Sequence, residues 1–223
     1  MITVHHLNHS RSQRILWLLE ELGLQYDIKH YARDGKTLLA PSALRKVHPL
    51  GKSPVITDGE RTIAESGAII EYLIERHGQG RLAPAAGTPA RLRYNYWLHY
   101  AEGSLMPLLV MRLVFSRLKT VPAPFFVKPV IRALVGKVHG TFIDPQLRQH
   151  VAFLEGELTH GPWFAGDEFS AADIQLSFPV EAAAARGGLG DSPRLKSWLE
   201  RIQLRSAYKR ALERGGPFEL LTG

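Results

Sequence analysis

The sequence predicts an α/β domain at the N-terminus followed by an all-α domain, and three observations support this fold class. Across residues 1–80, strand-like apolar runs alternate with segments of helical period. Residues 81–89 are rich in Gly, Pro and Ala and indicate a linker. Across residues 90–223, apolar residues recur with the helical period, and no convincing strand is found.

The first domain begins with a predicted strand–helix–strand unit. Residues 2–7 and 26–31 have the composition of strands, and residues 14–22 lie between them as a helix. Apolar residues at i, i+3, i+4 and i+7 from Ile15 form one face of this helix, and Gly23 supplies its C-terminal stop. Such an order brings the two strands together in parallel.

A β-hairpin and a helix complete the predicted N-terminal domain. The Asp-Gly pair at residues 58–59 is a tight-turn signal that would join strands at residues 54–57 and 61–64. A helix is predicted at residues 66–77, where apolar side chains recur on one face. The polar residues 32–50 are expected to be irregular, with one short helix.

Helices account for the rest of the chain. Residues 90–119 are predicted as one long helix with a kink near Pro107, because proline removes a backbone donor. Several prolines within residues 122–129 break the next stretch, and residues 146–159 again show an apolar helical face. The last predicted helices are residues 193–203 and 207–214.

Two segments have the spacing of a capping box, in which a serine and the residue three positions later satisfy each other's backbone donors. One runs from Ser170 to Asp173, and we interpret it as purely structural. The other runs from Ser10 to Gln13, just before the first helix, where a serine could serve either as a cap or in chemistry. Ser66 is likewise a good N-cap for the helix that follows it.

The composition is that of an ordinary globular protein, with 45% hydrophobic and 22% charged residues among 223. The chain has no cysteine, which excludes disulfides, thiolate zinc sites and a cysteine nucleophile. Residues 1–7 lack the pattern of a signal peptide, and the most apolar helix candidate, residues 105–115, is too short to cross a bilayer. We therefore expect a cytoplasmic protein without stable membrane insertion.

The net charge is +7, but Lys and Arg are scattered and form no run of five or more. Solvated helix faces explain this pattern, so nucleic acid is not an expected partner. Among the ten histidines, His5 and His6 would point to opposite faces of a strand, and no H-E-x-x-H motif is present. Glycine-rich nucleotide motifs are also missing from a suitable context, so neither a metal nor a nucleotide cofactor is expected.

The most informative feature is a pair of short segments, residues 48–55 and 65–69. The first places Pro54 at the mouth of an apolar strand, where a missing donor leaves nearby backbone groups free to pair with an extended peptide. The second places Glu65 and Ser66 at the start of a helix, where an amine and a carboxylate could be held. Together they suggest a site for a small peptide-like ligand.

These segments resemble the glutathione-binding half of the cytosolic glutathione transferases, whose motif is N-P-x-G-x-V-P-x-L, a hairpin and then E-S-x-A-I. His48 stands where the family usually has Asn, and Ser53 where Val is common. The resemblance covers nearly the whole chain. It implies a thioredoxin-like N-terminal domain, a helical C-terminal domain, a cytoplasmic homodimer and a role in detoxification, with glutathione as co-substrate.

The resemblance also implies how the residues around the ligand would act. Glu65 and Ser66 would hold the γ-glutamyl amine and carboxylate, and Lys52 would pair with the glycyl carboxylate. Ser53 would bond the cysteinyl unit through its backbone, next to a cis Ser53–Pro54 peptide. From the residues alone, an exposed lysine and a helix cap are the plainer interpretations of Lys52 and Ser66.

In this family the residue that activates the thiol lies in the loop after the first strand and is a tyrosine, serine or cysteine. Here the loop offers serine only, and Ser10 to Arg14 resembles the S-x-x-x-R spacing of serine-type members such as the theta and phi classes. Ser10 is therefore the expected catalytic residue of a bacterial, serine-type member, with Ser12, Asn8 and backbone donors as alternatives. A hydroxyl hydrogen bond and a helix N-terminus would both favour the thiolate.

The acceptor site is expected between the two domains. Its lining would come from an aromatic-rich part of the long helix, Tyr94, Trp97, Tyr100 and Ala101, although each of these could equally pack in the core. Phe125, in the proline-bounded insertion, would act as a lid, or the insertion could contact a membrane surface or a partner. An apolar pocket of this kind implies hydrophobic electrophiles.

The leading hypothesis is therefore a glutathione S-transferase that activates the thiol for attack on hydrophobic electrophiles, with reduction of organic hydroperoxides as a second activity to test. A glutathione-dependent isomerase is the alternative enzyme. A non-catalytic transferase-like binding or regulatory module is the alternative of a different class, and it would bind no glutathione or leave the thiol pKa unchanged. A reductase acting through its own mixed disulfide is excluded by the missing cysteine.

Overall fold

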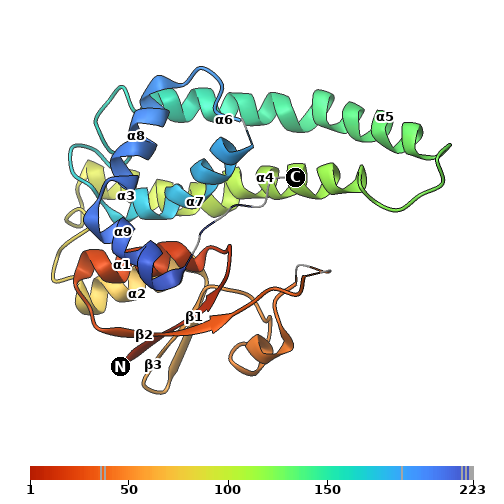
Figure 1. Ribbon diagram of the computed structural model, residues 1–223. Helices are drawn as coiled ribbons and strands as arrows, with labels where there is room; N and C mark the ends of the chain where they lie inside the picture. Colours follow the sequence, from red (N-terminus) through yellow and green to blue (C-terminus); the bar gives the residue numbers. More distant parts are fainter. Residues whose placement is uncertain (36, 38, 187, 217, 219, 221–223) are drawn as a thin grey trace.

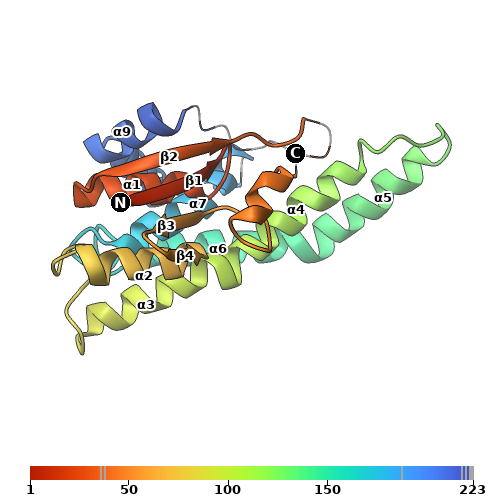
Figure 2. The ribbon, with the colours of Figure 1, turned by 90° about the horizontal axis from the view of Figure 1, so that it is seen from below.

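The two predicted domains are both present and pack against each other (Figure 1). The computed structural model describes residues 1–35, 37, 39–186, 188–216, 218 and 220. The N-terminal domain is built on a β-sheet, and the C-terminal domain is a bundle of helices of which two project away from the sheet (Figures 1 and 2).

A four-stranded mixed sheet forms the N-terminal domain, in the order β2-β1-β3-β4. Its strands are β1 (Ile2–Leu7), β2 (Tyr26–Tyr31), β3 (Val55–Asp58) and β4 (Arg61–Ala64). β1 pairs in parallel with β2, as predicted, and antiparallel with β3, a pairing on which the sequence analysis made no prediction. The first hairpin strand begins one residue later than predicted, because Pro54 has no N–H to offer to the ladder, and Asp58 pairs with Arg61.

Helices α1 (Ser12–Leu22) and α2 (Ser66–His77) lie between the sheet and the helical domain (Figure 1). α1 starts two residues before its prediction and ends at Gly23, which adopts the left-handed φ of 69° expected of a C-terminal glycine. Leu16 and Trp17, outside the predicted apolar face, are fully buried too. α1 is enclosed by the sheet on one side and by helices on the other, so residues outside the predicted apolar face are buried as well.

The predicted long helix exists as α3 (Pro89–Tyr100) and α4 (Met106–Leu118), joined by the π-helical turn Ala101–Leu105. Pro107 lies in the first turn of α4, where it cannot donate to the carbonyl one turn earlier. The wider π turn accommodates this lost donor at the predicted position of the kink. The turn also carries Glu102, which belongs to the cleft described below.

Helix α5 (Lys128–Val138) was not predicted, because the prolines before it indicate a break. Pro129 in fact lies in the first turn of the helix, where its missing N–H has no intrahelical partner to lose. α4 and α5 run side by side and extend away from the sheet (Figures 1 and 2). The segment that joins them carries Phe125, which is 85% exposed.

Helix α7 runs through the bundle, packs against α1, α3, α4 and α8, and is buried along most of its length. The short helix predicted within residues 32–50 is a 3-10 helix at Ser42–Lys46, and a π turn at His139–Ile143 precedes α6. The helices not yet bounded are α6 (Asp144–Glu157), α7 (Ala171–Ala185), α8 (Pro193–Gln203) and α9 (Ser206–Gly215). The bounds of α6, α8 and α9 differ from the predicted bounds by about two residues at most, the usual disagreement at helix ends.

The predicted capping box at the start of α7 is present and buried. Ser170 donates to Asp173 Oδ2 from both its backbone N and its Oγ, at 3.1 and 3.3 Å. The other oxygen of Asp173 accepts from Phe164 N at 3.1 Å and from Trp198 Nε1 at 3.0 Å. Burial raises the pKa of Asp173 to about 6 against the effect of these donors. The box therefore joins α7 to α8 and to the loop before α7.

One continuous cluster of buried apolar side chains runs through both domains. It includes side chains from the sheet, from α1 and α2, and from the helices of the C-terminal domain. Among the described residues, no helix is both long and apolar enough to cross a membrane. The shared core sets the relative position of the two domains, and hence the shape of the cleft between them.

Candidate functional site

Two adjoining cavities, of about 460 Å³ and about 450 Å³, form a cleft between the domains. The first is lined by all five residues expected to hold the peptide-like ligand: Lys52, Ser53, Pro54, Glu65 and Ser66. Ser10 lines the second cavity. Residues common to both linings, including Arg11, Lys52 and Ser53, show that the two cavities are halves of one cleft.

The loop before β3 forms one wall of the first cavity. The Ser53–Pro54 peptide is cis, as the resemblance implied. Ser53 Oγ donates to the carbonyl of His5 on β1 at 3.1 Å, which ties the loop to the sheet. Gly51 has φ of +58°, and a Cβ there would lie 2.7 Å from Arg45 Cγ, so glycine is needed for both reasons. This turn brings Arg45 over the loop and into the lining of the cavity.

Glu65 and Ser66 stand at the junction between β4 and α2. Glu65 has φ of 70° and ψ of 125°, a conformation that costs a non-glycine residue about 1–3 kcal/mol. Ser66 is the first residue of α2 and not its N-cap, so the simple capping interpretation does not hold. Its hydroxyl instead accepts a hydrogen bond of 2.9 Å from Arg14 Nη2. The strained junction points the start of α2 at the cavity.

Arg14 is buried at this end of the cleft, with only 1% of its surface exposed, and it holds several elements together. Besides Ser66, its guanidinium donates to the carbonyl of Gln175 on α7 at 2.5 Å and pairs with Glu102 of the π turn. Glu102 also pairs with Arg11 Nε at 3.1 Å. Burial lowers the pKa of Arg14, and Glu102 opposes that effect. The sequence placed Arg14 only in the serine-type spacing and did not indicate its partners.

A chain of hydrogen-bonded hydroxyls runs under the cleft. Ser10 Oγ lies 2.8 Å from Ser12 Oγ, which in turn lies 2.9 Å from His6 Nδ1. Ser10 Oγ also approaches Ser53 Oγ at 3.4 Å, and Ser53 donates onward to the carbonyl of His5. The three serines and two strand residues thus connect β1, the start of α1 and the loop before β3.

The protons of this chain can be assigned from the charge of His6. Burial and the neighbouring His30 lower the pKa of His6 to about 4, so its ring is neutral at pH 7. The backbone of Gly215 takes a hydrogen bond from the ring, and we infer that Nδ1 is left as the acceptor for Ser12. Since Ser12 donates to His6 and Ser53 to a carbonyl, Ser10 is left as the donor toward Ser12 Oγ at 2.8 Å and Ser53 Oγ at 3.4 Å. Its hydroxyl therefore stands at the start of the chain, and it lines the second cavity.

The capping box expected from Ser10 to Gln13 is not formed. The N-cap position of α1 is Arg11, which is itself helical and makes no side-chain cap bond. Gln13 is buried, and neither its amide nitrogen nor its amide oxygen has a partner among the described residues. Ser10 Oγ accepts only a long bond of 3.3 Å from Ser12 N. Ser10 therefore faces the cleft and does not close the helix end.

Asn8, the other alternative to Ser10, is engaged elsewhere. Its side-chain oxygen accepts from the backbone N of Arg33 at 2.8 Å, and its carbonyl accepts from Arg33 Nε at 3.2 Å. These bonds hold the loop after β1 against the loop after β2. Asn8 is absent from the linings of both cavities, whereas Ser10 is present in the second.

Several arginines around Ser10 were missed by the sequence analysis. Burial, followed by repulsion from Arg11 and Arg117, lowers the pKa of Arg33. Burial, followed by repulsion from Arg112 and Arg117, lowers the pKa of Arg186. The mutual repulsion shows a positive potential at the second cavity, which would stabilise an anion beside Ser10. These arginines lie far apart in the sequence, and no local pattern marks them.

The wall of the second cavity is apolar but differs from the predicted one. The four predicted residues of this wall pack in the helical core, each no more than 6% exposed: Tyr94, Trp97, Tyr100 and Ala101. They line neither cavity of the cleft. Phe125 lies in the segment between α4 and α5 and also lines neither cavity of the cleft. The wall comes instead from later turns of the same segment and from α7: Met106, Leu109, Val110, Leu113, Val114, Phe178 and Ala182.

The four predicted wall residues are buried for a simple physical reason. They point into the bundle, where the ring centroids of Trp97 and Phe164 lie 4.8 Å apart. Only beyond the π turn does the helix present its apolar face to the cleft. Aromatic composition favoured α3, whereas the cleft uses aliphatic side chains of α4. Within the described part of the chain, no group of three or more His, Asp and Glu side chains is arranged to hold a metal ion.

Comparison with known proteins places this architecture. Residues 1–75 match the glutathione S-transferase N-terminal domain family, and residues 138–201 match the corresponding C-terminal domain family. The chain is 37% identical to glutathione S-transferase 3 of Schizosaccharomyces pombe, over 96% of this chain and 88% of the relative. It is 33% identical to glutathione S-transferase 1 of Saccharomyces cerevisiae, over 96% of this chain and 95% of the relative.

A crystal structure of a glutathione S-transferase from Actinobacillus pleuropneumoniae superposes on the protein with a TM-score of 0.77, at 33% sequence identity. The similarity covers 98% of this chain and 95% of that one. It therefore includes the sheet, the cleft and the helical domain together. With both domains matched in order and relatives this similar over nearly their whole length, the chain belongs to the glutathione S-transferase family.

Proposed function

We propose that the protein binds glutathione in the cleft and activates its thiol for transfer to hydrophobic electrophiles. The observation that carries the proposal is the Ser10 hydroxyl, which stands at the start of the hydrogen-bonded chain where the peptide half of the cleft meets its apolar half. Turned toward a thiolate, this donor would exchange its bond to the neutral Ser12 oxygen for a stronger bond to a charged sulfur. Family membership supports the same reaction.

The first cavity has groups suited to each end of the tripeptide. The strained Glu65 and the first turn of α2 would take the γ-glutamyl amine and carboxylate, since the first N–H groups of a helix have no internal partner. Lys52, together with Arg45 and His48, would take the glycyl carboxylate at the other end. The backbone of Ser53 would pair with the cysteinyl unit between them. The arginines around the cleft add a general attraction for this anionic ligand.

The thiol would then lie beside Ser10. A free thiol has a pKa of about 8.5, so only a few per cent is ionised at pH 7. The Ser10 hydroxyl, the N-terminal end of α1 and the nearby arginines all stabilise the thiolate, and each pKa unit corresponds to about 1.4 kcal/mol. The thiol proton leaves to solvent. The sulfur forms a bond to the electrophilic carbon as the leaving group departs with its electron pair.

The apolar half of the cleft would receive the acceptor. Aliphatic side chains of α4 and the ring of Phe178 form its wall, so selectivity would be broad and governed by size and apolar surface. Reduction of organic hydroperoxides uses the same thiolate and is the second activity that we propose to test. A panel of aryl halides, enals and cumene hydroperoxide would separate conjugation from peroxide reduction. A glutathione-dependent isomerase would instead regenerate free glutathione at each turnover.

We also propose that the protein works as a homodimer in the cytoplasm, the compartment in which glutathione keeps thiols reduced. A group of exposed apolar side chains on α4, α5 and their joining segment supports a subunit contact, because monomers rarely expose large apolar patches. The group consists of Val114, Leu118, Phe125, Phe126, Val130 and Leu134. Sedimentation equilibrium at micromolar concentration measures the mass, and a monomer would contradict the proposal.

A thiolate titration tests the activity. Absorbance near 240 nm of glutathione bound to the protein, followed against pH, should give a midpoint at least one unit below that of free glutathione. Ser10→Ala should raise the midpoint by about 1–2 units with little loss of binding, because one hydrogen bond to a charged group is removed. Ser12→Ala is the matched control, since its proton is used inside the chain, and it should shift the midpoint less.

Each outcome separates the hypotheses. Binding of glutathione without a lowered midpoint would favour a non-catalytic module. A midpoint unchanged by Ser10→Ala would move the activation to backbone donors or to the arginines. No binding at millimolar glutathione would leave only the shared fold.

A further inference from the structure

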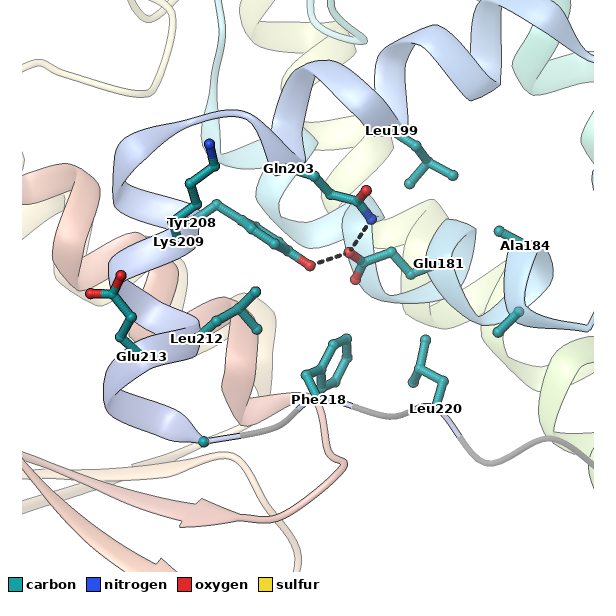
Figure 3. A pocket seen from close by; sticks show the side chains of 12 residues that line it. Glu181, Ala184, Leu199, Gln203, Tyr208, Lys209, Leu212, Glu213, Phe218 and Leu220 are labelled. Atoms are coloured by element: carbon teal, nitrogen blue, oxygen red, sulfur yellow. Dashed lines mark hydrogen bonds between the residues drawn. The ribbon is translucent and has the colours of Figure 1, made fainter.

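A third cavity, of about 930 Å³, lies between α7, α8, α9 and the side chains of Phe218 and Leu220. It is larger than either half of the cleft and adjoins the second half at Leu220, which lines both, but its lining includes none of the residues proposed to bind glutathione. Figure 3 shows the side chains that line it, with apolar groups below and beside the carboxylate of Glu181. Nothing in the proposed transfer reaction uses this cavity.

The carboxylate belongs to Glu181, on the face of α7 that turns away from the cleft. The residue is 7% exposed. One oxygen, Oε1, accepts from the Tyr208 hydroxyl at 2.5 Å and from Gln203 Nε2 at 3.4 Å. The other oxygen has no hydrogen-bond partner among the described residues, and in Figure 3 it faces the open space toward Phe218. A buried carboxylate oxygen therefore opens into the cavity.

The surroundings of this oxygen are apolar. The walls of the cavity are formed by apolar side chains (Figure 3): Leu199, Ala184, Leu212, Phe218 and Leu220. Charged side chains stand only at the edge of the lining, where Lys209 and Glu213 are exposed and point away from Glu181 (Figure 3). The cavity thus combines a long apolar surface with one acceptor at its inner end.

The cost of burying the Glu181 carboxylate without a counter-ion favours the binding of a cationic ligand. Burial raises the pKa of Glu181 to about 7, with Tyr208, Gln203 and the charge of Arg14 acting in the opposite direction. Arg14 is committed to Glu102 and Ser66, so Glu181 lacks a cation in contact with it. Burying an unpaired carboxylate is costly, and an ammonium group placed on its open oxygen would offset that cost.

We propose that this cavity is a second binding site that takes amphipathic amines, with the alkyl or aryl body on the apolar walls and the ammonium on Oε2 of Glu181. The site adjoins the acceptor half of the cleft at Leu220, which lines both cavities, but it has its own polar group in Glu181. Phe178 lines the acceptor half, and its ring packs against that of Phe218 at 5.9 Å, so these two rings lie at the border between the cavities. A ligand here would be carried alongside glutathione without entering the reaction.

The test compares three eight-carbon probes, n-octylamine, n-octanol and octanoate, by calorimetry at pH 8 with and without saturating glutathione. The amine should bind at least tenfold more tightly than the alcohol, and octanoate should bind least. Equal binding of amine and alcohol would overturn the proposal. Competition between octylamine and glutathione, or an apolar glutathione conjugate, would also overturn it, because the cavity would then be part of the cleft.

Glu181→Gln keeps the size of the side chain and its acceptor for Tyr208 but removes the charge. It should abolish the preference for the amine and leave octanol binding in place. Glu213→Gln is the matched control at the exposed edge and should change neither ligand's affinity. A second variant, Ala184→Phe, should fill the cavity and weaken both ligands, and it keeps the test decisive if Glu181→Gln fails to fold. Undiminished amine binding in either cavity variant would place the ligand elsewhere.

The pH dependence gives an independent readout. An ammonium ion binds the ionised carboxylate, so affinity should rise about tenfold per pH unit up to about pH 7 and then level off. Besides Glu181, the groups around the carboxylate are Tyr208 on α9, Gln203 on α8 and Arg14 on α1. The same profile in Glu213→Gln would assign the slope to Glu181. A flat profile would show that no buried carboxylate takes part.

Discussion

Residues 10–13 and residues 170–173 share the spacing of a capping box and stand at the starts of α1 and α7, but their polar groups behave differently. At the start of α7, both oxygens of Asp173 are occupied by buried donors. At the start of α1, the amide of Gln13 has no partner among the described residues, and Ser10 turns toward Ser12 and Ser53.

The difference comes from what surrounds each helix start. Phe164 and Trp198 enclose the start of α7 and bring donors to Asp173. The start of α1 opens on the cleft, so the hydroxyl of Ser10 stays available to a ligand. A completed box can only stabilise the fold, whereas an incomplete one leaves a donor for chemistry. Two equal sequence patterns therefore support different roles, and substitutions at each should separate them.

The largest effect is expected at the completed box. Asp173→Ala leaves the backbone N of Phe164, the N of Ser170 and the indole N–H of Trp198 buried without an acceptor, and should lower the free energy of unfolding by about 3–5 kcal/mol. Urea unfolding measures the loss, and thiolate titration of the folded fraction should be unchanged. Asp173→Asn, which keeps one acceptor oxygen, should lose less. A loss below about 1 kcal/mol would contradict the structural role.

An intermediate effect is expected at Glu65, where the cleft carries backbone strain that the start of α7 lacks. Glu65→Ala should weaken glutathione binding more than tenfold, or about 1.4 kcal/mol, because the carboxylate proposed to hold the γ-glutamyl amine is lost. Glu65→Gly should weaken binding similarly, yet raise the free energy of unfolding by about 1 kcal/mol relative to Glu65→Ala, since glycine accepts φ of 70° without strain. Calorimetry and urea unfolding measure the two effects. Equal stabilities of the two variants would show that the junction is unstrained.

The smallest effect is expected at Gln13, the unpaired member of the incomplete box. Gln13→Leu should raise the free energy of unfolding by about 0.5–1 kcal/mol, because a buried amide without partners is replaced by an apolar group of similar size. Gln175→Leu is the matched control, since that buried amide donates to the carbonyl of Leu98. Gln175→Leu should raise the free energy of unfolding less than Gln13→Leu does, or should lower it. A clear loss in Gln13→Leu would reveal a partner for the amide in solution.

Much of the fold was predictable because its signals are local. The parallel strand pair, the hairpin and the stop at Gly23 follow from periodicity and turn chemistry within a few residues. The helix α5 was missed because a proline in a first turn has the same sequence signature as a proline that breaks a helix. The five residues predicted to hold the peptide-like ligand all line the first cavity, since they belong to two short motifs, and their binding role stays a prediction.

The rest of the site could not be predicted from local patterns. The acceptor wall was assigned to α3 because aromatic composition does not reveal which face of a helix meets the core, and Trp97 proved to be buried there. Arg14, Glu102 and Ser66 come from three separate elements, and only the packed structure brings them together.

By itself, then, the sequence determined the elements, their order and the motif residues that line the first cavity, because hydrogen bonding and side-chain period act over neighbouring residues. Tertiary structure alone decided which hydroxyl stands at the start of the hydrogen-bonded chain, which helix face lines the second cavity and where Glu181 lies buried. Those properties depend on donors, charges and exclusion of water contributed by residues distant in the chain. The spacing of Ser10 and Ser170 is identical, and only their surroundings distinguish them.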